Sequence, residues 1–349
     1  KLRKVIGEIK DMSLIKYIIK RALTMIPVLF GAITLVYILS RFMPGDPTIA
    51  YLPDHFTEET YLEMRHYLGF DQPLIVQYFR YLGDLFTGDW GRSVTIAHGE
   101  DVWVLIWQRF PRTMELTILA IIIASVIGIK TGVISARHRN KYKDTTIRGI
   151  SLVGVSIPIF WMGMILQYFL TYQIPILPAI GFKTAWYDNP EFITGFRLID
   201  SLITGKIYLT IDYLMHLILP VACLSFITLA SITRQTRSSM LEVLQQDYIR
   251  TARAKGCAEK DVINTHALKN ALIPTATVIG LNFGYLLSGA VLTETTFNLS
   301  GMGQLMITAI RRYDFYVINA GVFLVALTFI LINLAMDVIY GLLDPRIRY

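Results

Sequence analysis

The residues best suited to a chemical or mechanical task lie in one basic segment, Asp247–Pro274, which contains a single glycine at Gly256. Strongly apolar stretches flank the segment, so it is a polar connection between two apolar helices. No phosphate-binding loop accompanies it, because Gly205-Lys206 is followed by Ile207 and not by serine or threonine. Nucleotide hydrolysis by that route is excluded, and the connection is better suited to gripping a partner protein.

Other groupings that carry catalysis or bind a metal are missing from the sequence. It contains neither a nucleophile elbow nor a His-Glu-x-x-His pair. His216 has no partner at metal-ligand spacing, and we interpret it as structural. Lys130 lies about one turn from the end of an apolar stretch, where its ammonium can reach the membrane surface. Asn333 and Asp337 are one helical turn apart, which allows a proton relay but favours bonding between helices.

The composition indicates that membrane-spanning helices position the basic segment. The chain of 349 residues is 54% hydrophobic and 17% charged, and its mean hydropathy is +0.49. Soluble proteins rarely combine such values. Six apolar stretches are long enough to cross about 30 Å of hydrocarbon as helices. We therefore predict an all-α polytopic membrane protein with spans at Ala22–Phe42, Met114–Ile134, Gly149–Tyr172, Tyr213–Ile232, Leu272–Thr293 and Ile318–Tyr340.

The distribution of basic residues predicts the orientation of the chain. Lysine and arginine are concentrated in the N-terminal segment, in the second and fourth loops and in the tail, whereas the long alternate loops contain few. Positive residues favour the cytoplasmic side, so both termini and the basic segment are expected in the cytoplasm. The formal net charge of +7 follows from this bias, and no nucleic-acid partner is expected.

The predicted spans divide the chain into successive regions. Residues 1–21 form a cytoplasmic or interfacial segment, in which Leu14–Ala22 is predicted to lie as a short helix against membrane lipid. The regions that follow are the first span at 22–42, an extracytoplasmic loop subdomain at 43–113, a five-helix core at 114–342 with a cytoplasmic loop at 233–271, and a cytoplasmic tail at 343–349.

The extracytoplasmic loop is predicted to be partly helical. Thr57–Leu68 begins with an N-cap threonine and two glutamates in the first turn, which is typical of a helix start. Pro73–Phe86 is predicted to be a second helix, which Gly88 ends. Loops of this length usually have a function or form a small docked subdomain.

Within the basic segment, Gly256 is predicted to be a joint between two short helices. Arg250–Lys255 has good helix formers, and glycine can take the left-handed position that ends a helix. A second helix is predicted over Glu259–Asn270, ending before Pro274, which would open the fifth span. An ordinary basic loop that merely follows the charge bias is the alternative.

Small residues and prolines are predicted to shape the spans. Stripes of small residues let helix backbones approach closely, either within the chain or between two subunits. Prolines at positions 27, 158 and 220 are expected to bend their helices. The stripes are Gly280, Gly284 and Ser288 in the fifth span, and Gly128, Gly132 and Ala136 in the second.

Short motifs in a fixed order give the chain a resemblance to a known family. Arg250-Thr251-Ala252-Arg253-Ala254-Lys255-Gly256 resembles the coupling loop of ABC importer permeases, with arginine where the general pattern has glutamate. The chain as a whole resembles the B-type permease of the oligopeptide and dipeptide importers. The further motifs that carry this resemblance are Met43–Pro47, Leu68–Pro73, Gly88–Ser93, Glu294–Phe297 and Leu343–Arg346.

The resemblance implies a type I importer permease in a prokaryotic inner membrane. A heterodimer with a second permease is expected, with one or two ATPase subunits that bind ATP and magnesium, and an extracytoplasmic binding protein. No cofactor, metal or catalytic residue is expected in this chain. The implied ATPase-coupling residues are Arg250, Thr251, Ala252, Arg253, Ala254, Lys255, Gly256 and Pro274, and the implied pathway or interface residues are Gly280, Asn282, Phe283, Gly284, Tyr285 and Ser288.

The implied cargo is a dipeptide or oligopeptide, with oligosaccharides, glutathione or nickel as alternatives. A stand-alone secondary transporter is the competing class. It would be expected to show inverted repeats or a charged cluster at mid-membrane, and the sequence offers neither convincingly.

Overall fold

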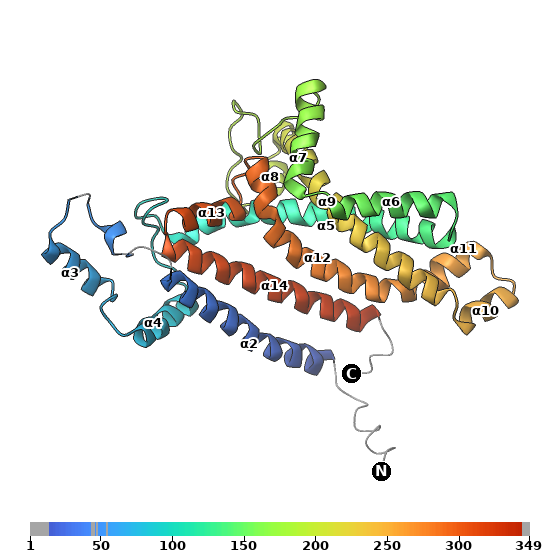
Figure 1. Cartoon of the computed structure of the whole chain (residues 1–349), viewed down its shortest axis with the longest axis horizontal. Helices are drawn as coiled ribbons and strands as arrows, with labels where there is room; N and C mark the ends of the chain where they lie inside the picture. Colours follow the sequence, from blue (N-terminus) through green and yellow to red (C-terminus); the bar gives the residue numbers. More distant parts are fainter. Residues whose placement is uncertain (1–13, 43–45, 47, 54, 344–349) are drawn as a thin grey trace, which may run out of the picture.

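The protein is helical throughout the part of the chain that the computed structural model describes, residues 14–42, 46, 48–53 and 55–343 (Figure 1). The only β-type pairing in these ranges is a single bridge between Arg92 and Asp101. The predicted all-α class is therefore confirmed. Predictions for residues 1–13 and for most of the tail, 344–349, fall outside the described ranges.

Five helices of the described chain are long and apolar enough to cross a membrane. They pack lengthwise, with α10 at one end of the molecule and α3 at the other (Figure 1). Each overlaps one predicted span, and all but α2, which stops one residue short of Phe42, cover their span in full and extend beyond it. They are α2 (Leu14–Arg41), α5 (Val102–Arg137), α9 (Ile207–Val243), α12 (Leu268–Thr296) and α14 (Phe315–Leu343).

The first of these helices differs from the prediction at its start. A separate interfacial helix was expected over Leu14–Ala22, but α2 runs without interruption from Leu14 to Arg41. No helix-breaking residue separates the two parts, and α2 continues through Pro27. The predicted boundary after residue 21 therefore corresponds to no break in the chain.

The predicted third span is two helices and not one. α6 (Tyr142–Ser156) and the pair α7 (Ile159–Gln167) with η2 (Tyr168–Gln173) meet at an angle of 102°. Pro158 disfavours helical dihedrals in the residue before it, and Ile157 is extended, with φ −88° and ψ 127°. The bend at this proline is confirmed, and the count reaches six spans only if the bent pair is one span.

Glycines on α5 allow close packing against α9 in the core. A Cβ atom on Gly128 would lie 2.8 Å from Cγ2 of Ile232, and one on Gly132 would lie 2.9 Å from the carbonyl oxygen of Thr233. Both neighbours belong to α9. The stripe on α5 therefore serves packing within the chain.

The stripe on α12 faces α14. A Cβ atom on Gly284 would lie 2.1 Å from the ring of Phe329, and one on Gly280 would lie 2.6 Å from Cγ of Met336. On its other side α14 packs against α2, where Asp337 lies 3.5 Å from Nε of Arg21. Asp337 therefore pairs between helices, as the favoured interpretation predicted.

The loop subdomain after α2 has the two predicted helices, α3 (Glu58–Tyr67) and α4 (Leu74–Thr87). The Thr57 hydroxyl accepts a hydrogen bond from the Thr60 amide at 3.3 Å, and Gly88 ends α4 with φ +86°. Two further short helices were not predicted, α8 (Arg197–Ile203) and α13 (Met302–Arg311).

A buried carboxylate ties this subdomain to the core. Oδ2 of Asp314 accepts hydrogen bonds from the Ser93 hydroxyl at 2.7 Å and from the amides of Val94 and Thr95, both at 3.1 Å. Asp314 precedes α14 and is 1% exposed. The loop between α4 and α5 is therefore fixed to the start of the last long helix.

Candidate functional site

The basic segment folds as a short helix with a well-defined end. α10 spans Asp247–Ala254, and Gly256 follows its C-cap with φ +79°. The Gly256 amide donates to the Arg253 carbonyl at 3.0 Å, and the Cys257 amide donates to the Ala252 carbonyl at 3.2 Å. These two bonds form a Schellman motif, so the predicted joint at Gly256 has the expected backbone geometry.

One apolar side chain anchors α10 to the rest of the molecule. Ile249 is fully buried, and it packs in a cluster with residues from α5, α9, α12 and the intervening π-helix η3 (Val262–Ala267). Such burial stabilises the contact by about 1.5–3 kcal/mol. The buried members of this cluster are Ala136, Met240, Ile249, Val262, Ile263, Ala267 and Ala271.

Polar contacts close the turn after α10. Arg253 donates from Nε and Nη2 to the two carboxylate oxygens of Glu259, at 3.1 and 2.9 Å. The hydrogen bond to Glu259 raises the pKa of Arg253. Asn270 donates to the Tyr248 hydroxyl at 2.7 Å. The turn is thus held on both sides, although an exposed ion pair contributes only about 0–1 kcal/mol.

The remaining predicted coupling residues form the free surface of this joint. Arg250, Thr251, Ala254, Lys255 and Gly256 are exposed, and Ala252 is half-buried. The surface is basic and contains little apolar area, which suits a polar, acidic partner cleft. α10 thus presents an exposed polar surface and is held to the bundle by the buried side chain of Ile249.

The link from this joint to α12 is more continuously helical than predicted. A helix ending before Pro274 was expected, but α11 (Glu259–Asp261), η3 and α12 follow one another without a gap, and Pro274 lies inside α12. Proline removes the hydrogen bond to the carbonyl four residues earlier and its ring crowds that carbonyl, but α12 stays helical on both sides of Pro274. The prediction that Pro274 opens the span is therefore wrong, and the chain is helical without a gap from Glu259 into α12.

A buried ion pair that the sequence did not reveal supports the same region. Arg237 of α9 donates from Nε and Nη2 to the Asp144 carboxylate at 2.7 and 2.8 Å. The Ser135 hydroxyl donates to the same group at 2.5 Å. Asp144 is fully buried, so α5, α6 and α9 are joined by a desolvated contact. Its partners lie 93 positions apart in the chain, and no local pattern indicates such a pairing.

The predicted pathway residues do not face one direction. Gly280 and Gly284 pack against α14, and Asn282 donates to the Ser231 hydroxyl of α9 at 2.9 Å. Phe283 is half-buried at the edge of the core, whereas Tyr285 is 69% exposed. Ser288 lies in α12, and its side chain is outside the described part of the chain.

Glu294 is a further residue whose place the sequence did not reveal. It is 1% exposed, and it accepts hydrogen bonds from the Thr113 hydroxyl at 2.5 Å and the Gln304 amide at 3.0 Å. A Cβ atom on Gly301 would lie 2.2 Å from its carboxylate. The absence of a side chain at Gly301 leaves room for this carboxylate. Its hydrogen bonds join α12 to α5 and α13.

The fold and the site together define a class, a multi-span membrane protein with a short, exposed basic helix between two long apolar helices. Two family models match the chain. The binding-protein-dependent transport system inner membrane component matches residues 128–349, and the N-terminal model of the corresponding membrane component matches residues 14–117. The chain belongs to this family, and the resemblance drawn from its motifs is confirmed.

Similar proteins cover almost the whole chain. The di/tripeptide transport system permease protein of Pseudomonas aeruginosa is 43% identical over 338 residues, which are 96% of this chain and 99% of the relative. The dipeptide permease of Alkalihalophilus pseudofirmus is 42% identical over 340 residues, covering 96% and 100%. A probable D,D-dipeptide permease of Escherichia coli is 40% identical over 328 residues, covering 94% and 96%.

Proposed function

We propose that the chain is the transmembrane permease subunit of an ATP-driven importer and forms half of a pathway for dipeptides or short oligopeptides. The observation that carries the proposal is the exposed, basic α10 with its buried root at Ile249, found in a chain of this transport family. The proposed cargo is supported by relatives at 40–43% identity that are named as dipeptide or di/tripeptide permeases. None of the compared names favours oligosaccharides, glutathione or nickel.

The proposed partners are a second permease, one or two ATPase subunits that bind ATP and magnesium, and an extracytoplasmic binding protein. A second permease is supported by the exposed apolar face of α12, where Leu281, Tyr285 and Leu292 are 57%, 69% and 50% exposed. The ATPase subunits are supported by the polar surface of α10.

The proposed orientation places α10 in the cytoplasm. The described start of α2 and the described end of α14 are the ends of those helices that lie nearer to α10 (Figure 1). That arrangement agrees with basic residues on the cytoplasmic side. The end with α3 and α4 then faces the binding protein.

The proposed mechanism is a mechanical linkage. Closure of the ATPase subunits on ATP moves α10, and the cluster around Ile249 passes that movement to α9 and α12. Reversing a two-state equilibrium from 1:99 to 99:1 requires about 5.5 kcal/mol. A flexible connection between α10 and α12 would absorb the movement of α10. We propose that the Schellman turn and the continuous η3–α12 helix prevent this.

Replacing Gly256 with valine tests the proposal. Open space surrounds a Cβ atom at this position, so the cost is the left-handed backbone, about 1–2 kcal/mol or more for a β-branched residue. We expect the assembled transporter to keep hydrolysing ATP while peptide uptake falls by about tenfold or more.

Gly205 supplies a matched control for this variant. It ends α8 with the same pair of Schellman bonds, φ is +69°, and a Cβ atom there also meets open space. The change Gly205→Val introduces the same backbone strain far from α10 and should leave coupling intact. Full uptake in Gly256→Val would contradict the proposed linkage.

A further inference from the structure

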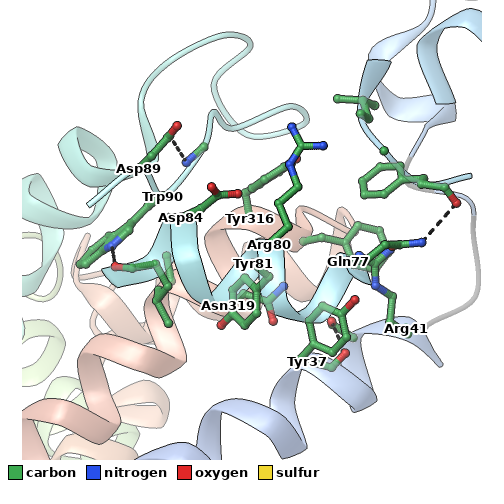
Figure 2. Close-up of a pocket in the computed structure, with 18 of the residues that line it drawn as sticks. Tyr37, Arg41, Gln77, Arg80, Tyr81, Asp84, Asp89, Trp90, Tyr316 and Asn319 are labelled. Carbon is green, nitrogen blue, oxygen red and sulfur yellow. Dashed lines mark hydrogen bonds between the residues drawn. The ribbon is translucent and has the colours of Figure 1, made fainter. Parts of the chain in front are cut away.

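A cavity of about 320 Å³ lies at the end of the molecule opposite α10. Residues of α2, of α4, of the loop at 89–91 and of the first turns of α14 line it (Figure 2). Small-molecule sites usually span roughly 300–1,000 Å³, so this cavity suits a ligand of a few residues at most. The coupling surface and the pathway candidates on α12 do not contribute to it.

Charges of both signs line this cavity. Arg41 and Arg80 supply two guanidinium groups, and Asp84 and Asp89 supply two carboxylates. Arg80 and Asp84 are one turn apart on α4, yet the ion pairs within the described ranges include none of these four residues. In Figure 2 the labelled side chains run from Arg41 at one edge to Asp89 at the other. Unpaired opposite charges in one cavity are suited to a ligand that carries both charges.

The two ends of the cavity are pre-arranged. The Arg41 guanidinium lies 5.1 Å from the ring centre of Tyr37 and 5.0 Å from that of Phe70. Stacking of this kind fixes its plane for a carboxylate. At the other end, the Gly91 amide donates to Oδ1 of Asp89 at 3.2 Å.

Buried polar atoms in the wall lack partners in the described structure. Gln77 is 8% exposed, and its amide nitrogen donates to the carbonyls of Phe70 and Gln72 at 3.3 and 2.7 Å. Its Oε1 atom has no hydrogen-bond partner, nor does the buried Oδ1 atom of Asn319. An unsatisfied buried acceptor costs about 1–3 kcal/mol. Both atoms are closed to solvent in this structure, so the charged groups, and not these acceptors, carry the recognition of a ligand.

We propose that this cavity binds the zwitterionic backbone of a short peptide, with its carboxylate at Arg41 and Arg80 and its ammonium at Asp84 and Asp89. The faces of Tyr37, Tyr81 and Trp90 contact the peptide side chains. The choice of a peptide among zwitterions rests on the proposed function, whereas the charge pairing rests on the cavity alone.

The surroundings favour a ligand from the aqueous side over a phospholipid. Gln77, Arg80 and Asp84 lie on one face of α4, and the exposed apolar residues Ile75 and Phe79 lie on the opposite face. The helix therefore separates the cavity from the apolar surface. Burial raises the pKa of Asp84, Arg80 lowers it and Asp89 adds to the rise; a bound ammonium would favour the ionised carboxylate.

The test uses the assembled transporter in lipid nanodiscs without its binding protein. Binding of Ala-Phe is measured by calorimetry and compared with N-acetyl-Ala-Phe and Ala-Phe amide. We expect saturable binding of the free dipeptide and a loss of about tenfold or more on blocking either end, the effect of one charged hydrogen bond.

Single substitutions test which charged residues bind the carboxylate and which bind the ammonium of the peptide. Arg80→Gln should reduce the advantage of the free carboxylate, because Arg41 alone remains, and Asp84→Asn should reduce the advantage of the free ammonium, because Asp89 alone remains. The exposed Glu63 of α3 lies outside the cavity, and Glu63→Gln should bind like the unchanged protein. Each variant is first checked for assembly with its partners, and the two cavity variants give independent readings.

Three results would overturn the proposal. One is no saturable binding of Ala-Phe up to about 20 mM, well above the 1 mM affinity equivalent to about −4 kcal/mol. Another is equal binding of the blocked peptides. The third is phosphoethanolamine displacing the dipeptide at lower concentration than Ala-Phe itself, which would assign the cavity to a lipid headgroup. Any of these results together with intact ATP-driven uptake would reject this site alone and leave the proposed function standing.

Discussion

At the residue scale, glycine serves two purposes in this chain, and the structure separates them. Gly256 and Gly205 have positive φ and open space around them, so their role is conformational. Gly284 and Gly128 lie inside helices against the side chains of neighbouring helices, so their role is to admit a close approach. The sequence predicts both kinds, because one follows a helix and the other recurs every four residues.

The close-approach glycines can be tested by adding a single methyl group. Gly284→Ala places a Cβ atom 2.1 Å from Cε2 of Phe329, and overpacking of this kind costs about 1–3 kcal/mol. Gly31→Ala is the matched control, because Gly31 is also helical and has nothing within 4 Å. We expect a lower unfolding temperature for Gly284→Ala and an unchanged or higher one for Gly31→Ala, measured by thermal scanning in detergent. Equal unfolding temperatures would show that α12 and α14 do not pack as described.

Side-chain contacts between residues far apart in the chain could not be predicted from the sequence. Asp144 and Arg237 are two ordinary charges in their local sequences, and only the fold brings them within 2.7 Å. Glu294 appears in a motif, but its burial against Thr113 depends on a contact 181 positions away. Pairings of this separation leave no periodic or local pattern.

At the element scale, two prolines behave in opposite ways. Pro158 separates α6 from α7, whereas Pro274 lies within α12. Steric conflict around a proline is local, but its outcome depends on packing. Ahead of Pro274, buried Val262, Ile263 and Ala267 fasten the helix to the α10 cluster, which keeps the chain helical through the proline. Apolar stretches therefore predict where helices lie, but proline alone does not predict where they end.

The helix α4 is a second element whose environment can be tested. Its face at Ile75, Phe79 and Phe86 is 61%, 64% and 56% exposed, and Phe86 contacts Phe30 of α2 with ring centres 5.7 Å apart. The apolar face is thus continuous with that of a spanning helix. Water would disfavour this exposure by about 25 cal/mol per Å², so we expect the face of α4 to lie in the outer leaflet of the membrane, parallel to its surface.

Spin labels placed along α4 would detect this arrangement. Labels at Ile75 and Phe79 should be accessible to oxygen and protected from a polar nickel reagent, whereas a label at Glu63 of α3 should show the reverse. Protection of the α4 positions from both reagents would indicate a protein partner on this face and contradict the lipid assignment.

At the scale of the whole molecule, the two ends of the bundle have different surfaces, a basic exposed helix at one and a mixed-charge cavity at the other. α10 with its buried root occupies one end, and the α3–α4 subdomain with the mixed-charge cavity occupies the other (Figure 1). The long helices α9 and α12, with 37 and 29 residues, contribute to the cluster around Ile249 at the first end, and α2 and α14 line the cavity at the second. Composition and charge bias predict this two-ended plan, because both depend only on hydrophobicity and on loop charge. The bent α6–α7 pair and the contacts of α8 and α13 depend on tertiary packing, and the sequence does not reveal them.

The orientation of that plan can be read from the two cysteines of the chain. Cys257 is exposed directly after Gly256, and Cys223 is fully buried in α9. With α10 in the cytoplasm, a membrane-impermeant maleimide should label inside-out vesicles and leave spheroplasts unlabelled. Cys257→Ser should abolish labelling, because the thiol of Cys223 is inaccessible. Docked ATPase subunits should slow the reaction at Cys257, since the residue borders the proposed contact. Labelling of intact spheroplasts at Cys257 would reverse the orientation and remove the basis for an ATPase contact at α10.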